Sequence, residues 1–210
     1  MPHSWSIIIL DFRFSTRRSL AVFCFLAVLA GCDNSANNPA TQFSGIDITG
    51  ADYGKALKLT DQTGKVRTLD DFKGKVVLVF FGFTQCPEVC PTTLHDLAKV
   101  VQQLGPDAER VQVLFVTLDP ARDTQDVLAK FVPAFHPNFV ALRGSDAEIK
   151  VTAQSFHVFF EKRPGTTPEN YTIEHFTGTF VFDREGRLRL LMNYGIGLDK
   201  ILHDVKLLLS

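Results

Sequence analysis

The sequence predicts an α/β protein with a mixed central sheet flanked by helices. Two runs of apolar, largely β-branched residues, 75–81 and 111–118, have the length and character of central strands covered on both faces. Helical patterns follow both runs, so strand and helix alternate along the chain. Two short apolar runs then flank the polar turn 183–187, which predicts an antiparallel hairpin. A sheet with parallel and antiparallel strands follows from this order.

Local signals set the bounds of the other elements. Leu94, Leu97 and Val101 repeat at helical spacing after the first long strand, and Gly105 and Pro106 end that helix. The predicted elements, in chain order, are a small hairpin of 57–59 and 66–68, the strand 75–81, the helix after Cys90, the strand 111–118, a helix over 124–132, a strand over 139–142, a helix over 145–156 with a capping box at its start, the hairpin of 177–182 and 188–192, and a last helix over 198–208.

The composition is that of a globular domain. The chain has 210 residues, a formal net charge of -1, 45% hydrophobic and 21% charged residues, and it is too apolar for a disordered chain. It lacks the basic excess that grips a phosphate backbone, so we expect no nucleic-acid binding. The length favours one domain with appended segments.

The first 32 residues are expected to be a lipoprotein signal peptide. Arginines precede the apolar run 20–30, which has the length of a signal-peptide core, and the segment ends in Leu-Ala-Gly-Cys at Cys32. This order resembles the bacterial lipobox, in which Cys32 is lipidated and becomes the mature N-terminus. An uncleaved membrane anchor with an incidental cysteine is the alternative, and a twin-arginine signal is matched only in part.

The predicted organisation has three parts, namely the signal peptide 1–32, a flexible tether over 33–42 and a folded α/β domain over 43–210. The tether is rich in Asn, Ala and Ser and has almost nothing to bury. Asp33 directly follows Cys32, which in Gram-negative lipoproteins favours retention at the inner membrane. We therefore expect a protein that is lipid-anchored at the periplasmic face of the bacterial inner membrane, where disulfides can form.

Cys86 and Cys90 remain in the mature chain and follow the first long strand. Cysteines at this place favour the thioredoxin-like version of the α/β class. The spacing is Cys-x3-Cys, and Pro91 suits the first position of the following helix, which predicts Cys90 as its N-cap. A thiolate at this helix start has a lowered pKa because it lies at the positive end of the helix dipole.

Three interpretations of the cysteine pair remain open: a structural disulfide, a redox-active dithiol and a metal site. A structural disulfide is disfavoured because a crosslink across so short a loop removes little entropy from the unfolded chain and therefore stabilises the fold only a little. A metal site needs a further ligand, and His175 is the candidate because it precedes the predicted strand 177–182 at the edge where α/β folds assemble sites. The other histidines of the domain, His95, His136, His157 and His203, are expected to be packed or surface residues rather than ligands. Two thiolates and one imidazole are too few for structural zinc but suit Cu(I).

Several segments together resemble the Sco/SenC family of copper chaperones. The matching segments are Gly-Phe-Thr-Gln-Cys-Pro-Glu-Val-Cys-Pro at 82–91, Asp-Ile-Thr-Gly-Ala-Asp-Tyr-Gly at 47–54 and Val-Thr-Leu-Asp-Pro-Ala-Arg-Asp-Thr at 116–124. The resemblance implies one copper per chain, as Cu(I) with Cu(II) as a further option, bound by Cys86, Cys90 and His175. It also implies delivery to the dinuclear copper centre of cytochrome c oxidase, or to another periplasmic copper protein.

The same resemblance gives Asp119 an indirect role near the metal, in orienting a ligand or tuning charge. The alternative, that Asp119 only ends a strand, stays open. For Asp123 and Thr124 we expect a helix-capping role. Gln85 and Phe176 depart from the family, which often has His before the first cysteine and a small hydroxyl residue after the histidine.

Two functions therefore compete. The first is a membrane-tethered copper chaperone, and the second is a thiol–disulfide reductase that keeps the cysteines of a partner protein reduced, with Cys86 and Cys90 as its catalytic pair. A peroxiredoxin-like function has less support around Cys86. Thioredoxin-like reductases carry a proline directly before the strand that faces the cysteines, whereas the last proline here is Pro168. This difference favours metal binding.

Overall fold

The structure is a computed structural model, and it describes residues 43–167 and 170–210 of the chain. The signal peptide predicted for 1–32, lipidation of Cys32 and the tether predicted for 33–42 lie outside the described residues. Among the described residues, no helix is both long and apolar enough to cross a membrane.

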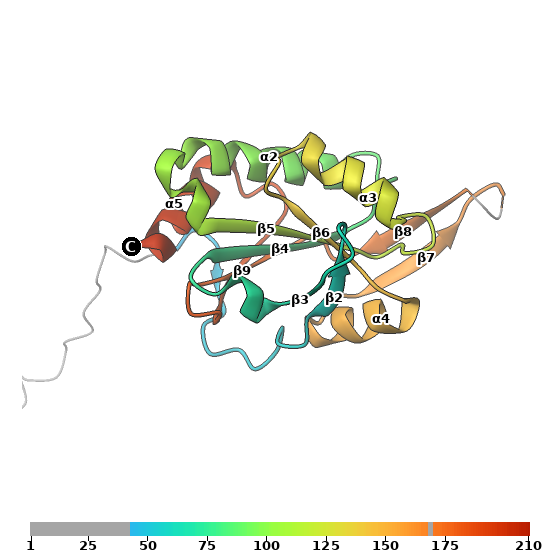
Figure 1. The fold of residues 1–210 in the computed structure, drawn as a ribbon, viewed down its shortest axis with the longest axis horizontal. Coiled ribbons are helices and arrows are strands. Elements are labelled where there is room, and N and C mark those ends of the chain that lie inside the picture. Colours follow the sequence, from blue (N-terminus) through green and yellow to red (C-terminus); the bar gives the residue numbers. More distant parts are fainter. Residues whose placement is uncertain (1–42, 168–169) are drawn as a thin grey trace, which may run out of the picture. The chain divides into compact units, whose positions relative to one another are not determined.

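An eight-stranded mixed sheet forms the centre of the described domain, in the order β1-β10-β9-β4-β5-β6-β2-β3 (Figure 1). The strands are β1 (Ile46–Asp47), β2 (Lys58–Asp61), β3 (Val66–Thr68), β4 (Val76–Gly82), β5 (Val111–Thr117), β6 (Val140–Arg143), β9 (Thr179–Phe182) and β10 (Leu188–Met192). Pairing is parallel between β4, β5 and β6 and antiparallel elsewhere in this sheet. The predicted α/β class with a mixed sheet and an N-terminal hairpin is confirmed.

Helices cover both faces of the sheet. They are α2 (Val89–Gln103), α3 (Gln125–Phe131), α4 (Asp146–Ser155) and α5 (Leu198–Leu209), with short 3-10 helices η2 (Leu69–Phe72), η3 (Gly105–Arg110) and η4 (Val132–Ala134). Apolar residues of α2, α3 and α5 pack on one face, and those of η2 and α4 pack on the other. Figure 1 shows α2 and α3 above the sheet and α4 below it.

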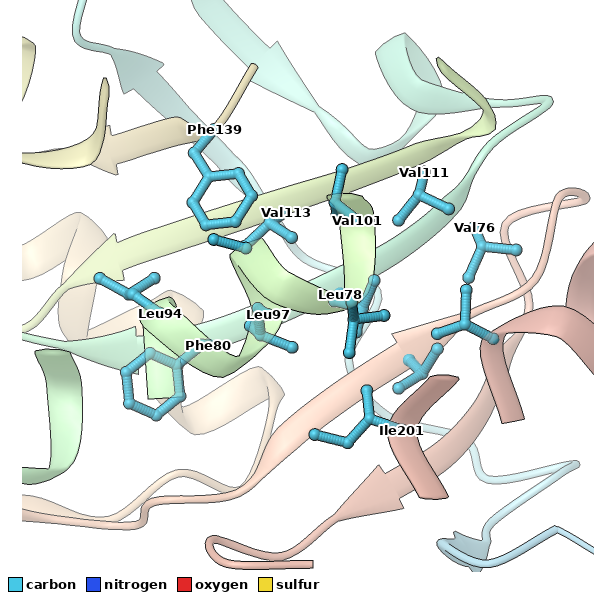
Figure 2. Packing of buried hydrophobic residues seen from close by; sticks show 14 of the residues in the cluster. Val76, Leu78, Phe80, Leu94, Leu97, Val101, Val111, Val113, Phe139 and Ile201 are labelled. Atoms are coloured by element: carbon cyan, nitrogen blue, oxygen red, sulfur yellow. The ribbon is translucent and has the colours of Figure 1, made fainter. Parts of the chain in front are cut away.

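Successive side chains of β4 point to opposite faces of the sheet. Val76, Leu78 and Phe80 point into the core beneath α2, as Figure 2 shows, while Val77 and Val79 point to the opposite face. Every residue of β4 and β5 is buried, which explains why both strands are largely apolar in sequence.

A separate hairpin was not predicted from the sequence. It consists of β7 (Phe160–Pro164) and β8 (Tyr171–His175), and its two strands pair only with each other. The expectation that His175 stands at the entrance to a strand over 177–182 is therefore wrong. His175 is the last residue of β8, and the next strand, β9, begins only at Thr179.

Candidate metal centre

The cysteine loop follows β4 at the carboxyl end of the parallel strands, where α/β folds assemble sites. Gly82 ends β4, and it must be a glycine for steric reasons. A Cβ atom at this position would lie 2.8 Å from Cys90 Sγ and 2.9 Å from the ring of Phe115. The missing side chain therefore lets the sulfur of Cys90 pack against the end of the strand.

Helix α2 begins two residues earlier than the sequence predicted. Glu88 is the N-cap and makes no side-chain cap bond, while Cys90 lies inside the first turn, so the expectation that Cys90 caps the helix is wrong. Pro91 is accommodated because none of the first four N–H groups has a partner within the helix. The sulfur of Cys86 takes over the capping role and accepts a bond from the backbone N–H of Cys90 at 3.4 Å.

The two cysteines are free thiols with opposite ionisation behaviour. A hydrogen bond from the Cys90 thiol, helped by the backbone N–H groups of Cys90 and Glu88, outweighs burial and lowers the pKa of Cys86 to about 4. The same hydrogen bond to Cys86, together with burial, raises the pKa of Cys90. At neutral pH the pair therefore consists of a Cys86 thiolate and a Cys90 thiol, so the lowered pKa expected at the helix start is found at Cys86 and not at Cys90.

His175 reaches the pair from β8. Its Nε2 lies 3.9 Å from Cys90 Sγ, and its Nδ1 lies 2.7 Å from the carbonyl oxygen of Phe176. Because that carbonyl can only accept, Nδ1 carries the proton and the lone pair of Nε2 is free to bind a metal. The rings of Phe80 and Phe83 stand edge-on to the imidazole, with centroid separations of 6.4 and 6.0 Å.

The three predicted ligands thus lie together, although they do not form a closed metal site. Over residues 43–167 and 170–210, no group of three or more His, Cys, Asp and Glu side chains has the arrangement of a metal-binding cluster. A sulfur and a nitrogen that are each about 2.0–2.3 Å from one metal ion lie roughly 3.5–4.3 Å apart, depending on the bond angle. The separation of 3.9 Å between Cys90 Sγ and His175 Nε2 falls in that range, so this pair fits a shared metal ion.

Asp119 does not bond to the ligands themselves. Its carboxylate accepts bonds from the guanidinium of Arg122 and, at 2.8 Å, from the hydroxyl of Tyr171. Burial and this bond to Asp119 raise the pKa of Tyr171 to about 12. Tyr171 begins the strand that His175 ends, so these bonds connect Asp119 to β8, and through Arg122 also to the cysteine loop.

Arg122 joins three segments around the centre and was not singled out from the sequence. Its Nη1 donates to Gln85 Oε1 at 3.1 Å and to the carbonyl oxygen of Tyr171 at 2.9 Å, and its guanidinium lies 3.6 Å from the centroid of the Tyr171 ring. The cysteine loop, the segment after β5 and β8 are therefore linked by one side chain. Its place in the Asp-Pro-x-Arg-Asp segment was the available signal.

Asp123 has a different role from the predicted helix cap. Thr124 is the N-cap of α3 and accepts a bond from the N–H of Val127, as expected. Asp123 instead accepts bonds from the N–H and hydroxyl of Thr84, at 3.0 and 2.5 Å, and from the hydroxyl of Thr117 at 2.6 Å. It therefore holds the start of the cysteine loop, and its burial raises its pKa.

Comparisons with known proteins show which family and which solved structures this chain resembles. The family model described as SCO1/SenC matches residues 47–210. An SCO2-like protein from Rickettsia prowazekii is 36% identical over 135 residues, which are 64% of this chain and 66% of that relative. The alignment thus spans just under two thirds of the relative's length.

Two solved structures are similar over nearly their whole length. The copper-bound structure of ScoI from Bradyrhizobium japonicum has a TM-score of 0.66 and 34% identity and covers 77% of this chain and 97% of its own. The solution structure of apo Sco1 from Thermus thermophilus has a TM-score of 0.71 and 39% identity and covers 79% of this chain and 96% of its own. These similarities confirm the predicted thioredoxin-like fold.

Proposed function

This chain belongs to the SCO1/SenC family, and we propose that it is a copper chaperone that binds one copper ion through Cys86, Cys90 and His175. The observation that carries the proposal is the position of His175 Nε2, 3.9 Å from Cys90 Sγ and beside the thiolate of Cys86. Two sulfurs and one imidazole nitrogen form a soft ligand set that suits Cu(I), which accepts low coordination. Cu(II) would require a further oxygen or nitrogen donor.

The ionisation of the pair decides how copper enters. Cys86 is already a thiolate at neutral pH, whereas Cys90 keeps its proton because its pKa is raised. Copper binding therefore displaces one proton, from Cys90. His175 would bind copper through Nε2, since its Nδ1 faces the carbonyl oxygen of Phe176.

Delivery completes the proposed function. Lipidation of Cys32 and the tether over 33–42 would hold the domain at the periplasmic face of the inner membrane. The acceptor implied by the family resemblance is the copper-bearing subunit of cytochrome c oxidase, at its dinuclear centre, with another periplasmic copper protein as the alternative. Release proceeds by ligand exchange, in which acceptor thiols replace the ligands of this chain one at a time.

Copper titration of the reduced protein against a Cu(I) chelator of known affinity tests the proposal. We expect one copper per chain, and an affinity at least about 100-fold lower in His175→Ala, because loss of a ligand exceeds the usual effect of losing a ligand's hydrogen-bond partner. His203→Ala, at an exposed position on α5, is the matched control and should bind copper normally. Equal copper affinity in wild type and His175→Ala would contradict the proposal.

A second candidate function, thiol–disulfide reduction, is favoured by the split in cysteine pKa values. The Cys86 thiolate would attack a partner disulfide and release one partner thiolate, and Cys90 would then attack Cys86 and release the second. Two electrons pass to the partner, and a Cys86–Cys90 disulfide forms. Reduction of insulin by the protein at a rate that His175→Ala leaves unchanged, together with unchanged copper affinity, would favour this function over the first.

A further inference from the structure

The cysteine loop and β8 line two adjoining open grooves, which together form a cleft. One groove, of about 580 Å³, is lined on one side by Cys86 and Pro87 and on the other by residues 172–177. A second groove, of about 310 Å³, shares Pro87 and Thr172 with the first and continues along β8 to Asn170. The cleft therefore follows the whole of β8, and Cys86 and His175 both lie in its wall.

The strand β8 has a free edge along this cleft. In antiparallel pairs, residues alternate between those whose backbone groups bond to the partner strand and those whose groups point away. Phe176 N–H donates to the carbonyl oxygen of Phe159, so the backbone groups of Ile173 and His175 point away from β7. The bond from Arg122 to the carbonyl oxygen of Tyr171 comes from the same outer side and supports this assignment.

The charges of the cleft restrict what it can hold. Glu174 and Arg163 are charged lining residues, and they pair with each other at 2.7 Å. Among the described residues, no other Asp, Glu, Lys or Arg lines either of the two grooves. Most of the other lining residues of the larger groove are apolar, and Phe159 at its rim is 64% exposed. An extended, uncharged segment therefore fits these walls, because they are mostly apolar and their two charged side chains already pair with each other.

We propose that an extended, uncharged, thiol-bearing segment of the copper-accepting protein docks in this cleft as a third strand beside β8. The five residues of β8 give room for a segment of about the same length. Backbone bonds to Ile173 and His175 would fix its register and bring its thiol to Cys86. This inference rests on the proposed copper delivery, because it identifies how the acceptor presents its ligand.

The test uses peptides rather than the unidentified acceptor. The probe is Ala-Val-Thr-Cys-Thr-Val-Ala, whose cysteine carries a disulfide-linked thionitrobenzoate. The thiolate of Cys86 attacks the peptide sulfur, a disulfide forms between Cys86 and the peptide, and thionitrobenzoate leaves as a coloured thiolate with the electron pair of the broken bond. The rate of colour release is divided by the rate with a small aromatic disulfide, which corrects for changes in Cys86 itself.

Two isomeric analogues of the peptide provide the decisive comparison. One carries N-methyl groups on alternate residues, and the other carries them on the residues between. Only one set of N–H groups can face β8, so we expect one analogue to react about tenfold more slowly than the parent and the other to stay within about twofold. Equal rates for both analogues, whether fast or slow, would overturn the proposal.

A pair of protein variants locates the docking site. Phe159→Glu adds a charge at the rim of the cleft and should abolish the difference between the two analogues. Val151→Glu makes the same change on α4, at a residue that is 59% exposed and lines a different groove, and it should preserve the difference. A difference that survives Phe159→Glu would place docking elsewhere.

Copper titration of the same preparation separates the two proposals. If the protein binds copper normally but reacts equally fast with both analogues, the docking proposal is wrong and the copper chaperone proposal stands. If the protein reacts at different rates with the two analogues but does not bind one copper per chain, the copper chaperone proposal is wrong, and the protein is a dithiol that binds peptides.

Discussion

Two buried aspartates at opposite ends of the central sheet have pKa values that are shifted in opposite directions. Asp183 follows β9 near the amino end of β4, and although its burial acts to raise its pKa, bonds from the backbone and side chain of Arg187 and from Arg189 lower it. Asp123 lies at the carboxyl end of β5. Burial raises the pKa of Asp123. The hydrogen bonds that it accepts come from uncharged threonines, and they do not offset the effect of burial. Within the described residues, no Lys or Arg side chain forms an ion pair with it.

The difference distinguishes two ends of the sheet: the end at Asp183, which we call the structural end, and the end at Asp123 and the cysteine loop, which we call the functional end. Cations compensate the carboxylate of Asp183, so that turn is built for stability. The end with the cysteine loop holds the Asp123 carboxylate and the Cys86 thiolate without full compensation, and the charge of Asp123 contributes to the raised pKa of Cys90. A bound cation would relieve this excess of negative charge.

The largest expected effect concerns the two cysteines. In Cys86→Ser, alkylation by iodoacetamide at pH 6 should be more than about 100-fold slower than in wild type, because Cys90 is buried and burial still raises its pKa after the hydrogen bond to Cys86 is lost. In wild type the rate should stay nearly constant from pH 6 to pH 8, since Cys86 is already ionised. Asp183→Asn, at the other end of the sheet, should not alter this profile. A rate that rises tenfold per pH unit in wild type would contradict a thiolate at Cys86.

The next effect concerns stability at the structural end. Asp183→Asn should lower the free energy of unfolding at pH 7 by about 1.5–3 kcal/mol, because its charge-assisted bonds are lost. The folded pKa of Asp183 is lowered, so its contribution is present above the ordinary value of 3.8 and is lost as pH falls through the lowered value. Urea unfolding at pH 7 and at pH 3 should show a smaller difference between wild type and variant at pH 3. An equal difference at both pH values would refute this assignment.

Replacing one arginine at each end of the sheet by glutamine extends the comparison. Arg122→Gln should weaken Cu(I) binding by about tenfold, because the variant releases β8 and the cysteine loop from each other. Arg187→Gln is the matched change at the structural end and should lower stability without changing copper affinity. If both variants bind copper like wild type, Arg122 has no positioning role.

The smallest effect is expected at Asp123. Its raised pKa means that ionisation destabilises the folded state as pH rises above the ordinary value for aspartate, so Asp123→Asn should be neutral or stabilising at pH 7, within about 1 kcal/mol. The pKa of Cys90 should fall in the variant, because a neighbouring negative charge is removed. Thiolate absorbance at 240 nm measures that change. A variant as destabilised as Asp183→Asn would show that the two ends do not differ.

The sequence predicted the elements that bury a regular apolar pattern. Strands β4 and β5 and helices α2 and α5 lie where the apolar runs and stripes placed them, because their periodicity reflects the face that packs on the core. The hairpin of β7 and β8 was missed because β7 is mostly exposed and has no apolar alternation. Local pattern carries no information on a strand that packs outside the main sheet.

The candidate ligands could be predicted, whereas the side chains that hold them could not. Cys86 and Cys90 are close in sequence, but the bond from Arg122 to Tyr171 spans 49 residues and that from Thr84 to Asp123 spans 39. The pattern gave Asp123 a capping role because it directly precedes a helix, and only the tertiary structure shows that it turns back to the cysteine loop.

X-ray absorption of the reduced protein loaded with one Cu(I) tests the central claim most directly. The account predicts a first shell of two sulfur atoms and one nitrogen atom, with the outer-shell scattering of a single imidazole that disappears in His175→Ala and persists in His203→Ala. A first shell of two sulfur atoms alone, identical in wild type and His175→Ala, would contradict it.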